Sequence, residues 1–348
     1  MKAIVTTGHG GYERLEYREV PVPELGPGDV LLQVLAAGVN NTDINTRIGW
    51  YGNREDASAT GDDSDAAQGW SGETPFPLIQ GADCCGRIVT MASDVAGLRL
   101  GARVLVRPCM RVSGFGALDT VWLGTDFDGA FAQFVRVKAD EVFEVRSTWS
   151  DAELATVPCA YGTAENMLQR AGVRAGDRVL VTGASGGVGS AVVQLAKCRK
   201  AHVIAVTTRE KSAQLRSIGT DEVLNREDDL LQQCADKGLN SVDVVVDNVA
   251  GAGFGALLKI LRRGGRYVSS GAIAGANVAL DMRDLYLKDI SLLGCTAWTE
   301  SVFPALIGYI ERDEIKPLLA GTFALADIVS AQQQFLQKQH VGNLVLVP

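Results

Sequence analysis

The sequence lacks the features that mark secreted, membrane-spanning and nucleic-acid-binding proteins. Its 348 residues include only seven cysteines, a small and odd number that argues against a secreted disulfide framework. No stretch approaches the roughly 18 consecutive apolar residues of a membrane span. A long basic run is also missing, and the formal net charge is −8. This balance argues against a nucleic-acid or anionic-membrane partner.

A secretory signal is missing as well. Residues 1–20 show a polar-interrupted strand pattern without the apolar core of a signal peptide, so we expect a cytoplasmic protein. Only Cys84 and Cys85 lie close together in the sequence, and adjacent cysteines rarely bridge each other. We therefore expect all seven thiols to be reduced and most to be small core residues.

What is present is typical of a globular chain with two domains. Apolar residues make up 47% and charged residues 21% of the sequence, and the length favours two domains over one core. The first 150 residues are rich in short strands separated by glycine turns. The expected strands are KAIVTT (2–7), DVLLQVLAAGV (29–39), GRIVTM (86–91), ARVLV (102–106) and FAQFVRVKAD (131–140). This pattern predicts a compact β-barrel-like domain.

One stretch, residues 52–74, is acidic, rich in serine, glycine and alanine, and without periodicity. It is expected to be a long surface loop. Two interpretations are open, a solvated insertion of no consequence and a lid or oligomer contact.

The pattern changes near residue 151. Residues 151–173 read as a helix pair, after which strands and helices alternate. The expected strands are 177–183, 202–208, 243–249, 266–271 and 290–295, and the expected helices 190–200, 211–219 and 255–264. This alternation predicts a parallel sheet with helices on both faces. A tail of two helices and a last strand, NLVLVP, then returns to the first domain. We expect one domain at 1–155 with 297–348, and a second at 156–296.

The strongest motif is VTGASGGVG (181–189), which follows an apolar strand and opens an amphipathic helix. Glycine permits a tight turn, a close backbone approach to a pyrophosphate and close packing of helix on strand. The helix N-terminus offers N–H groups to phosphates. The motif therefore predicts a dinucleotide site that includes Ser185, Gly186, Gly187, Val188 and Gly189, and the alternative is a purely structural turn.

The end of the second strand indicates which dinucleotide is bound. An acidic side chain there would bind the ribose hydroxyl of NAD, whereas this chain has Thr207, Thr208, Arg209 and Lys211. Two hydroxyls and two cations suit a 2′-phosphate, so the expected cofactor is NADP(H). Glu210 is expected to point to solvent. In the alternative interpretation, Arg209 and Lys211 form an ordinary solvated helix start.

At this point the chain resembles the medium-chain dehydrogenase/reductase superfamily, and within it the zinc-free quinone oxidoreductase-like group. Besides the glycine motif, the resemblance rests on AAGVNNTD (36–43), GADCCGRIV (81–89) and the closing HVGNLVLVP. It implies an α/β protein with a GroES-like β-barrel catalytic domain and a Rossmann cofactor domain with a doubly wound parallel sheet. It also implies a small-molecule substrate and a homodimer or homotetramer.

The resemblance also bears on metal. Zinc-dependent alcohol dehydrogenases of this superfamily use Cys, His and Cys as catalytic ligands, with a Glu beside the His. The matching positions here are Asn40, Ala82 and Cys159, with Asp83 in place of the Glu. A zinc site needs three protein ligands, and the segment RPCMRVSG (107–114) holds a single cysteine where relatives have four. No zinc is expected.

Three residues are expected in catalysis from the resemblance. Asn40 would hydrogen-bond near the nicotinamide or substrate, Thr42 stands at a proton-relay position, and Tyr51 resembles a cleft tyrosine that could donate a proton. Each has a structural alternative. Asn40 would support a turn, Thr42 would cap a helix that follows, and Tyr51 would stack on substrate or pack on Trp50.

Further cofactor contacts follow from the resemblance. They are Thr163, Val249, Gly271, Ala272 and Asn343. The family often has lysine where Asn343 stands, and a tyrosine found near the adenine in relatives is missing from 224–229, where Arg226 is a conceivable substitute. The three histidines form no catalytic constellation.

The expected function is hydride transfer from NADPH to a quinone or an α,β-unsaturated carbonyl, without zinc. Conjugated acceptors need less help than simple carbonyls, because conjugation spreads the charge after hydride arrives. One alternative is an alcohol dehydrogenase or carbonyl reductase. A second, from another class, is a non-catalytic NADPH-binding protein. A coenzyme A thioester substrate also stays open.

Overall fold

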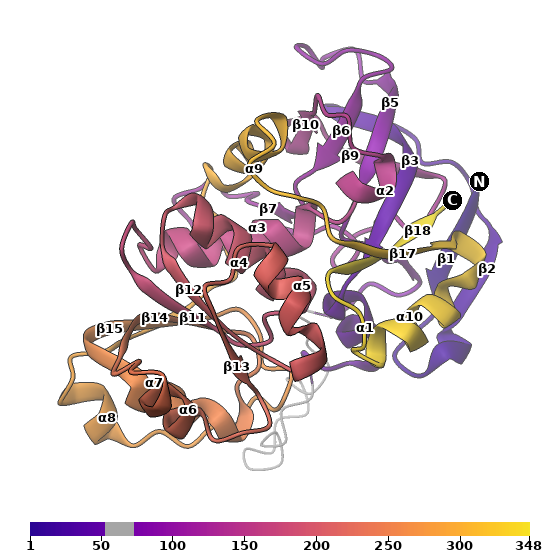
Figure 1. Ribbon diagram of the computed structural model, residues 1–348. Coiled ribbons are helices and arrows are strands. Elements are labelled where there is room, and N and C mark those ends of the chain that lie inside the picture. Colours follow the sequence, from indigo (N-terminus) through magenta and orange to yellow (C-terminus); the bar gives the residue numbers. More distant parts are fainter. Residues whose placement is uncertain (53–72) are drawn as a thin grey trace. The chain divides into compact units, whose positions relative to one another are not determined.

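The computed structural model describes residues 1–52 and 73–348, which form two compact units (Figure 1). The first unit comprises 1–159, 303–311 and 317–348, and the second comprises 160–302 and 312–316. The surface loop expected over 52–74 falls almost entirely outside the described residues.

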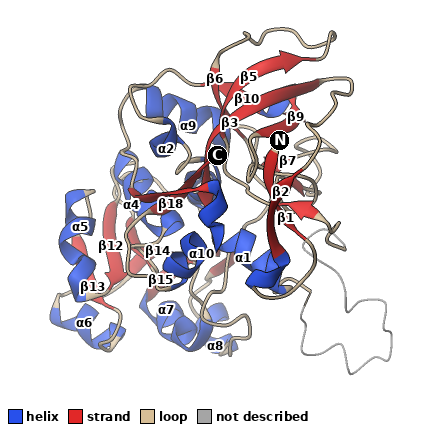
Figure 2. Ribbon diagram, turned by 90° about the vertical axis from the view of Figure 1, so that its right-hand side faces the viewer, coloured by secondary structure: helices blue, strands red, loops and turns tan. Residues whose placement is uncertain are grey.

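The first unit is built on a seven-stranded sheet (Figure 2). Its strands, in spatial order, are β10 (Val142–Glu144), β6 (Arg103–Val106), β5 (Cys85–Met91), β3 (Asp29–Val39), β18 (Asn343–Val347) and β17 (Leu319–Ala324), with β9 (Phe134–Lys138) also paired to β3. A three-stranded sheet, β2 (Leu15–Glu19), β1 (Lys2–Thr6) and β4 (Leu78–Ile79), and the hairpin β7 (Cys109–Met110) and β8 (Val121–Trp122) complete it.

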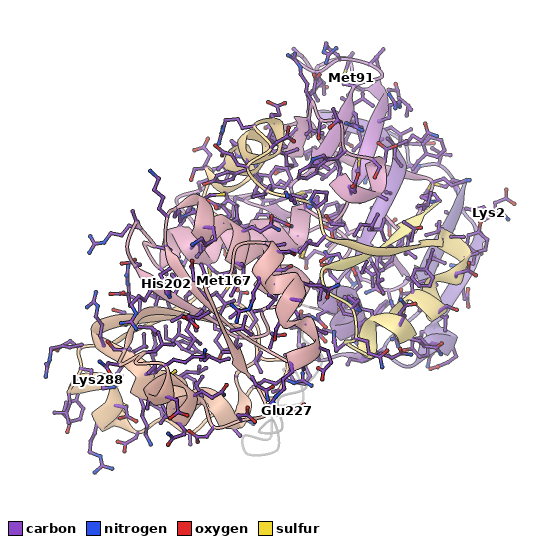
Figure 3. All side chains as sticks on the ribbon, viewed as in Figure 1. Lys2, Met91, Met167, His202, Glu227 and Lys288 are labelled. Atoms are coloured by element: carbon purple, nitrogen blue, oxygen red, sulfur yellow. The ribbon has the colours of Figure 1, made fainter. Side chains whose placement is uncertain are left out.

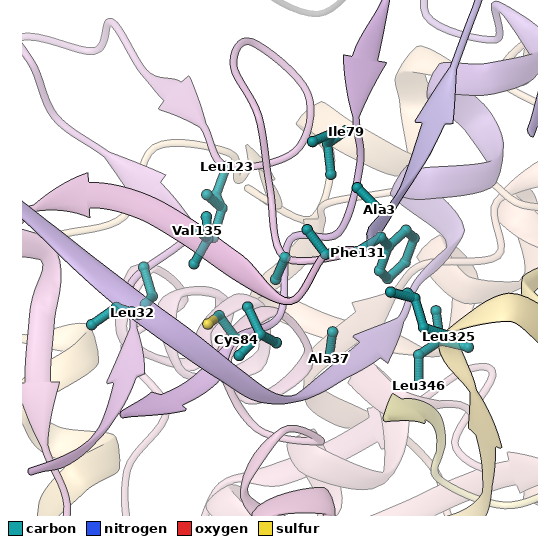
Figure 4. Close-up of a cluster of buried hydrophobic side chains, with 14 of the residues drawn as sticks. Ala3, Leu32, Ala37, Ile79, Cys84, Leu123, Phe131, Val135, Leu325 and Leu346 are labelled. Carbon is teal, nitrogen blue, oxygen red and sulfur yellow. The ribbon is translucent and has the colours of Figure 1, made fainter. Parts of the chain in front are cut away.

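The sequence explains why β3 is central. Its run DVLLQVLAAGV is apolar nearly throughout and is buried along most of its length, since it has strands on both sides. Figure 4 shows the core around it, a buried cluster that includes Leu32 and Ala37 together with Phe131, Val135 and Cys84. The α-helices that the described residues of this unit form are α1 (Asn41–Ile48), α2 (Asp151–Leu154), α9 (Val302–Glu311) and α10 (Ile328–Leu336).

The second unit holds a six-stranded sheet in which every neighbouring pair is parallel. The order is β13 (Glu222–Asn225), β12 (His202–Thr207), β11 (Arg178–Val181), β14 (Val242–Asp247), β15 (Leu261–Ser269) and β16 (Ser291–Gly294). The helices are α3 (Pro158–Arg170), α4 (Gly187–Cys198), α5 (Ser212–Ser217), α6 (Leu230–Asp236), α7 (Phe254–Ile260) and α8 (Met282–Tyr286). The order reverses direction between β11 and β14, as in doubly wound folds. The expected α/β class with a parallel sheet is confirmed.

Several expected boundaries need correction. The helix expected over 255–264 ends at Ile260, because Leu261 already pairs with Val242 as the start of β15. The strand expected over 131–140 spans only Phe134–Lys138. The expected tail of two helices and one strand omits β17, which pairs in parallel with β18.

Two other expectations concern cysteines and membranes. All seven cysteines lie among the described residues, and none of them is joined to another by a disulfide bond. Among the described residues, none of the helices combines the length and apolar character that a membrane crossing needs.

Candidate functional site

The glycine motif forms the turn between β11 and α4. Gly183 has φ +54, a left-handed conformation that favours glycine, and Gly186 is the N-cap of α4 without a side-chain cap. A Cβ on Gly189 would lie 2.2 Å from the Gly183 carbonyl oxygen, so α4 approaches the turn as closely as the backbone permits. The first N–H groups of α4 have no acceptor within the helix. This turn has the form of a phosphate cradle.

The structure brings the expected 2′-phosphate residues to one edge of the sheet. Thr207 ends β12, Thr208 follows it, and Arg209 and Lys211 lie in the next short turn. The Lys211 ammonium donates to the Ser185 hydroxyl over 3.5 Å, which joins this turn to the glycine motif. Arg209 is largely exposed and pairs with Asp228 at 3.0 Å.

Lys211 and Arg226 place two positive charges near each other at the same edge, where the Glu210 carboxylate also acts on Lys211. Burial lowers the pKa of Lys211, and the nearby positive charge of Arg226 lowers it further. The backbone N–H of Arg226 donates to the Thr207 carbonyl at 2.8 Å, which holds that residue beside the strand end. Glu210 is exposed, as expected. A dianionic phosphate would relieve the repulsion between these cations.

Two further turns follow β14 and β15. Val249 lies in the first of these turns, and its carbonyl accepts the N–H of Ala274 at 2.8 Å. The Asn248 side chain accepts from the N–H and the hydroxyl of Ser270, immediately before Gly271 and Ala272. The Ser270 hydroxyl also contacts Met167 of α3 at 3.3 Å, and Figure 3 labels that methionine. The expected contacts Val249, Gly271 and Ala272 therefore lie on two bonded turns.

In the first unit, Asn40 is the N-cap of α1. Its backbone N–H donates to the Asp43 carboxylate at 2.7 Å, and its side-chain amide donates to Asp83 Oδ2 at 2.7 Å. The other oxygen of Asp83 accepts the Cys159 backbone N–H at 2.6 Å. Asn40 and Cys159, two of the three positions that match the zinc ligands of relatives, are thus joined by the Asp83 carboxylate, and this bridging role was not predicted from the sequence.

Thr42 and Tyr51 come together near α1. The Tyr51 hydroxyl donates to Thr42 Oγ1 at 3.4 Å and accepts from the Asn45 amide at 3.5 Å. Burial raises the pKa of Tyr51. The alternative that Thr42 caps a helix is wrong, because Asn40 is the N-cap and Thr42 lies within α1.

Thr163 and Asn343 are the remaining residues expected to contact the cofactor, and their surroundings do not indicate that role. Thr163 is half-buried in α3. Asn343 starts β18 and is buried, and its amide donates to the Thr156 carbonyl at 3.3 Å. His202 starts β12, and His9 Nδ1 lies 3.0 Å from the Thr46 carbonyl oxygen. The cofactor roles of Thr163 and Asn343 stay predictions.

Asp43 and Asp83 make stability depend on pH in an unusual direction. Burial raises the pKa of Asp43 to about 7 and that of Asp83 to about 6. Between about pH 4 and pH 7 the folded protein therefore keeps protons that the unfolded chain has released. The contribution of each carboxyl to stability falls as pH rises through this window.

Asp43→Asn isolates this effect, since the substitution removes one titrating group. We expect the free energy of unfolding of the wild type minus that of the variant to decrease from pH 4.5 to pH 7.5, measured by urea denaturation. A difference that stays flat or increases would contradict the raised pKa.

Comparisons with known proteins agree with this geometry. Residues 26–147 match the family model "Alcohol dehydrogenase GroES-like domain", and residues 187–312 match "Zinc-binding dehydrogenase". The crystal structure of a candidate alcohol dehydrogenase from Sinorhizobium meliloti 1021 is 41% identical, with a TM-score of 0.91 over 100% of this chain and 96% of that chain.

Two relatives have named substrates. An acryloyl-coenzyme A reductase from Metallosphaera sedula is 29% identical over 99% of each chain. The 2-octenoyl-CoA carboxylase reductase CinF, solved with NADP and 2-octenoyl-CoA, is 25% identical, with a TM-score of 0.83 over 96% of this chain and 82% of that chain.

A GroES-like domain joined to a Rossmann-type parallel sheet defines an oxidoreductase of the medium-chain type. This chain belongs to the medium-chain dehydrogenase/reductase, or alcohol dehydrogenase-like, superfamily.

Proposed function

We propose that this protein transfers a hydride from NADPH to a carbon–carbon double bond conjugated to a carbonyl group, without zinc. The acceptor would be a quinone, an enone or an enoyl thioester. The observation that carries the proposal is the hydrogen bonding of Asp83. One of its carboxylate oxygens accepts from the Asn40 amide and the other accepts from the Cys159 backbone N–H.

The side chains at the zinc positions do not fit a catalytic zinc ion. Zinc requires three protein ligands, whereas Ala82 offers none and Asn40 offers an amide, a poor ligand already bonded to Asp83. Among the described residues, no group of three or more His, Cys, Asp or Glu side chains could hold a metal. In the proposed reaction the carbonyl group conjugated to the double bond, rather than a metal ion, therefore makes the substrate carbon electrophilic.

The protein's residues supply placement and protons in this proposal. When bound, the nicotinamide supplies the hydride. Burial raises the pKa of Tyr51, so its hydroxyl stays protonated, and in this proposal it exchanges its hydrogen bond to Thr42 for one to the substrate and donates its proton there. In this proposal Arg209 and Lys211, which follow Thr207 and Thr208, bind the 2′-phosphate of the cofactor. The acryloyl-coenzyme A reductase and CinF favour an enoyl thioester within the acceptor class.

A test is anaerobic consumption of NADPH and NADH against quinones, enones, enoyl-coenzyme A thioesters and aldehydes, with and without chelator, alongside measured metal content. We expect turnover of a conjugated acceptor with NADPH, unaffected by chelator. Activity confined to aldehydes and lost with chelator would favour the second candidate, an alcohol dehydrogenase, which the Sinorhizobium relative supports. Tight NADPH binding without turnover would favour a non-catalytic protein.

The cofactor preference has its own test in Arg209→Glu. The change replaces a cation at the expected 2′-phosphate position with a negative charge. We expect NADPH binding to weaken by about 1–3 kcal/mol while NADH binding barely changes. Titration of both cofactors measures the two constants.

Arg263→Glu is the matched control. Arg263 is as exposed as Arg209 and pairs with Asp289 at the same 3.0 Å, but it lies near the amino end of β15, away from the carboxyl ends of the strands. This variant should leave both binding constants unchanged. Equal losses for NADPH and NADH in Arg209→Glu would contradict the 2′-phosphate assignment.

A further inference from the structure

Asp247 lies where three neighbouring strands of the parallel sheet end. It is the last residue of β14, which pairs with β11 on one side and β15 on the other. Its side chain is 0% exposed. A carboxylate removed from water in this way is stable only if hydrogen-bond donors replace its hydration.

Those donors come from all three strands. The Asp247 carboxylate accepts from the Thr182 hydroxyl, directly after β11, and from the Tyr267 hydroxyl of β15 at 2.5 Å. It also accepts the backbone N–H groups of Val249 at 2.8 Å and Ala250 at 3.1 Å. Burial, and next the charge of Asp247, raise the pKa of Tyr267, so its hydroxyl remains a donor. The carboxylate thus joins the ends of β11, β14 and β15.

The bonds to Val249 and Ala250 hold an uncommon backbone. Ala250 has φ 55 and ψ −138, a conformation that residues with a Cβ rarely adopt. Because both N–H groups point at Asp247, the carboxylate stabilises this turn directly. This first turn also holds the turn after β15 by two hydrogen bonds. The Val249 carbonyl accepts the N–H of Ala274, and the Asn248 amide oxygen accepts the N–H of Ser270.

The position of these turns in the sheet indicates what they serve. A doubly wound sheet binds a dinucleotide with one mononucleotide half on each side of the point where the strand order reverses. Thr207 and Lys211 belong to the half that begins with β11, while the turns after β14 and β15 belong to the other half. If the adenosine phosphate binds at the first half, as proposed above, the nicotinamide half of the cofactor faces the second.

We propose that Asp247 is a positioning residue for the nicotinamide half of the cofactor: it fixes the turns that carry Val249, Gly271 and Ala272. The inference rests on the proposed binding of NADPH. Asp247 acts on the cofactor indirectly, through the backbone of the two turns. No single feature of the sequence near DVVVDN assigns this role.

Asp247→Asn tests the proposal, because the amide keeps the shape but cannot accept from all four donors. The measurement compares two ligands, NADPH and 2′,5′-ADP, which lacks the nicotinamide half. We expect the dissociation constant of NADPH to rise by about tenfold or more, and that of 2′,5′-ADP to stay within about twofold. Amide hydrogen exchange at Val249 and Ala250 should accelerate.

Tyr267→Phe keeps the proposal testable if Asp247→Asn fails to fold. The phenylalanine ring preserves the edge-to-face packing on Phe254, at 5.2 Å between centroids, and removes only one donor to Asp247. We expect the same selective effect on NADPH at about threefold. Equal weakening of both ligands in these variants would mean a general loss of folded protein and would overturn the positioning role, as would unchanged NADPH binding.

Failure of the proposed function is distinguishable from failure of this inference. If the wild type prefers NADH, the 2′-phosphate assignment is wrong, and the same comparison is made with NADH and AMP. A selective loss of NADH binding in Asp247→Asn would still support the positioning role. Absence of selectivity in both ligand pairs would overturn it whatever the cofactor.

Discussion

Gly189→Ala is expected to abolish useful dinucleotide binding and to destabilise the second unit. The added Cβ would lie 2.2 Å from the Gly183 oxygen and 2.7 Å from the Ala184 Cα. Both neighbours are backbone atoms, so α4 must move away from the turn it packs against. We expect a loss of about 1–3 kcal/mol of stability and NADPH binding weaker by roughly a hundredfold or more. Thermal unfolding and cofactor titration measure the two effects.

Gly255→Ala is the matched control for this substitution. Gly255 lies in α7 of the same unit, and a Cβ there would meet nothing within 4 Å. Since alanine favours helix over glycine, this variant should fold as well as the wild type or gain up to about 1 kcal/mol. If Gly189→Ala binds NADPH as well as Gly255→Ala does, the close approach of α4 to the turn is not needed for binding.

The glycine turn is also the part of the site that the sequence predicted best. Every signal for it is local: an apolar strand, glycines at a fixed spacing and an amphipathic helix, all within one βαβ unit. The location of Thr207, Thr208, Arg209 and Lys211 at and just after the end of β12 could be predicted for the same reason, and their role in binding a 2′-phosphate stays a prediction. These residues follow one another at the end of a predicted strand, so their location at the edge of the sheet follows directly from the sequence.

Interactions between distant segments could not be predicted in this way. The Asn40 amide was expected at a site, but its acceptor Asp83 lies 43 residues further along the chain. Asp247 accepts a hydrogen bond from Thr182, which lies 65 residues earlier in the chain. Nothing in DVVVDN indicates that the last acidic residue of this segment accepts several hydrogen bonds. Both are buried carboxylates, whose importance depends on donors supplied by tertiary structure.

Short elements were missed for another reason. The pair β13 and α6 has only a few residues each and is interrupted by acidic side chains, so periodicity gives little signal. The run LRRG looked helical because Leu261 continues the apolar spacing of α7. Leu261 instead pairs with Val242 of β14 and starts a strand. This pairing depends on a distant segment, so the local sequence does not predict it.

Tyr51→Phe is expected to produce the largest loss in turnover among changes to the first unit. Hydride addition to a conjugated acceptor leaves negative charge on oxygen, which a positioned proton donor can neutralise. Burial raises the pKa of Tyr51, so its hydroxyl stays protonated, and this hydroxyl would exchange its bond to Thr42 Oγ1, at 3.4 Å, for one to the substrate oxygen. We expect kcat with the best conjugated acceptor to fall about a hundredfold.

The dissociation constant of NADPH is expected to stay unchanged in Tyr51→Phe, because the residues proposed to bind the 2′-phosphate and pyrophosphate lie in the second unit. Stopped-flow measurement of NADPH oxidation in H₂O and D₂O separates the proton-dependent step from binding. Tyr17→Phe, at an exposed position on β2, serves as the control and should behave as the wild type. An unchanged kcat in Tyr51→Phe would mean that the tyrosine only packs against substrate, and the proton would then have to come from water or from Thr42 acting without it.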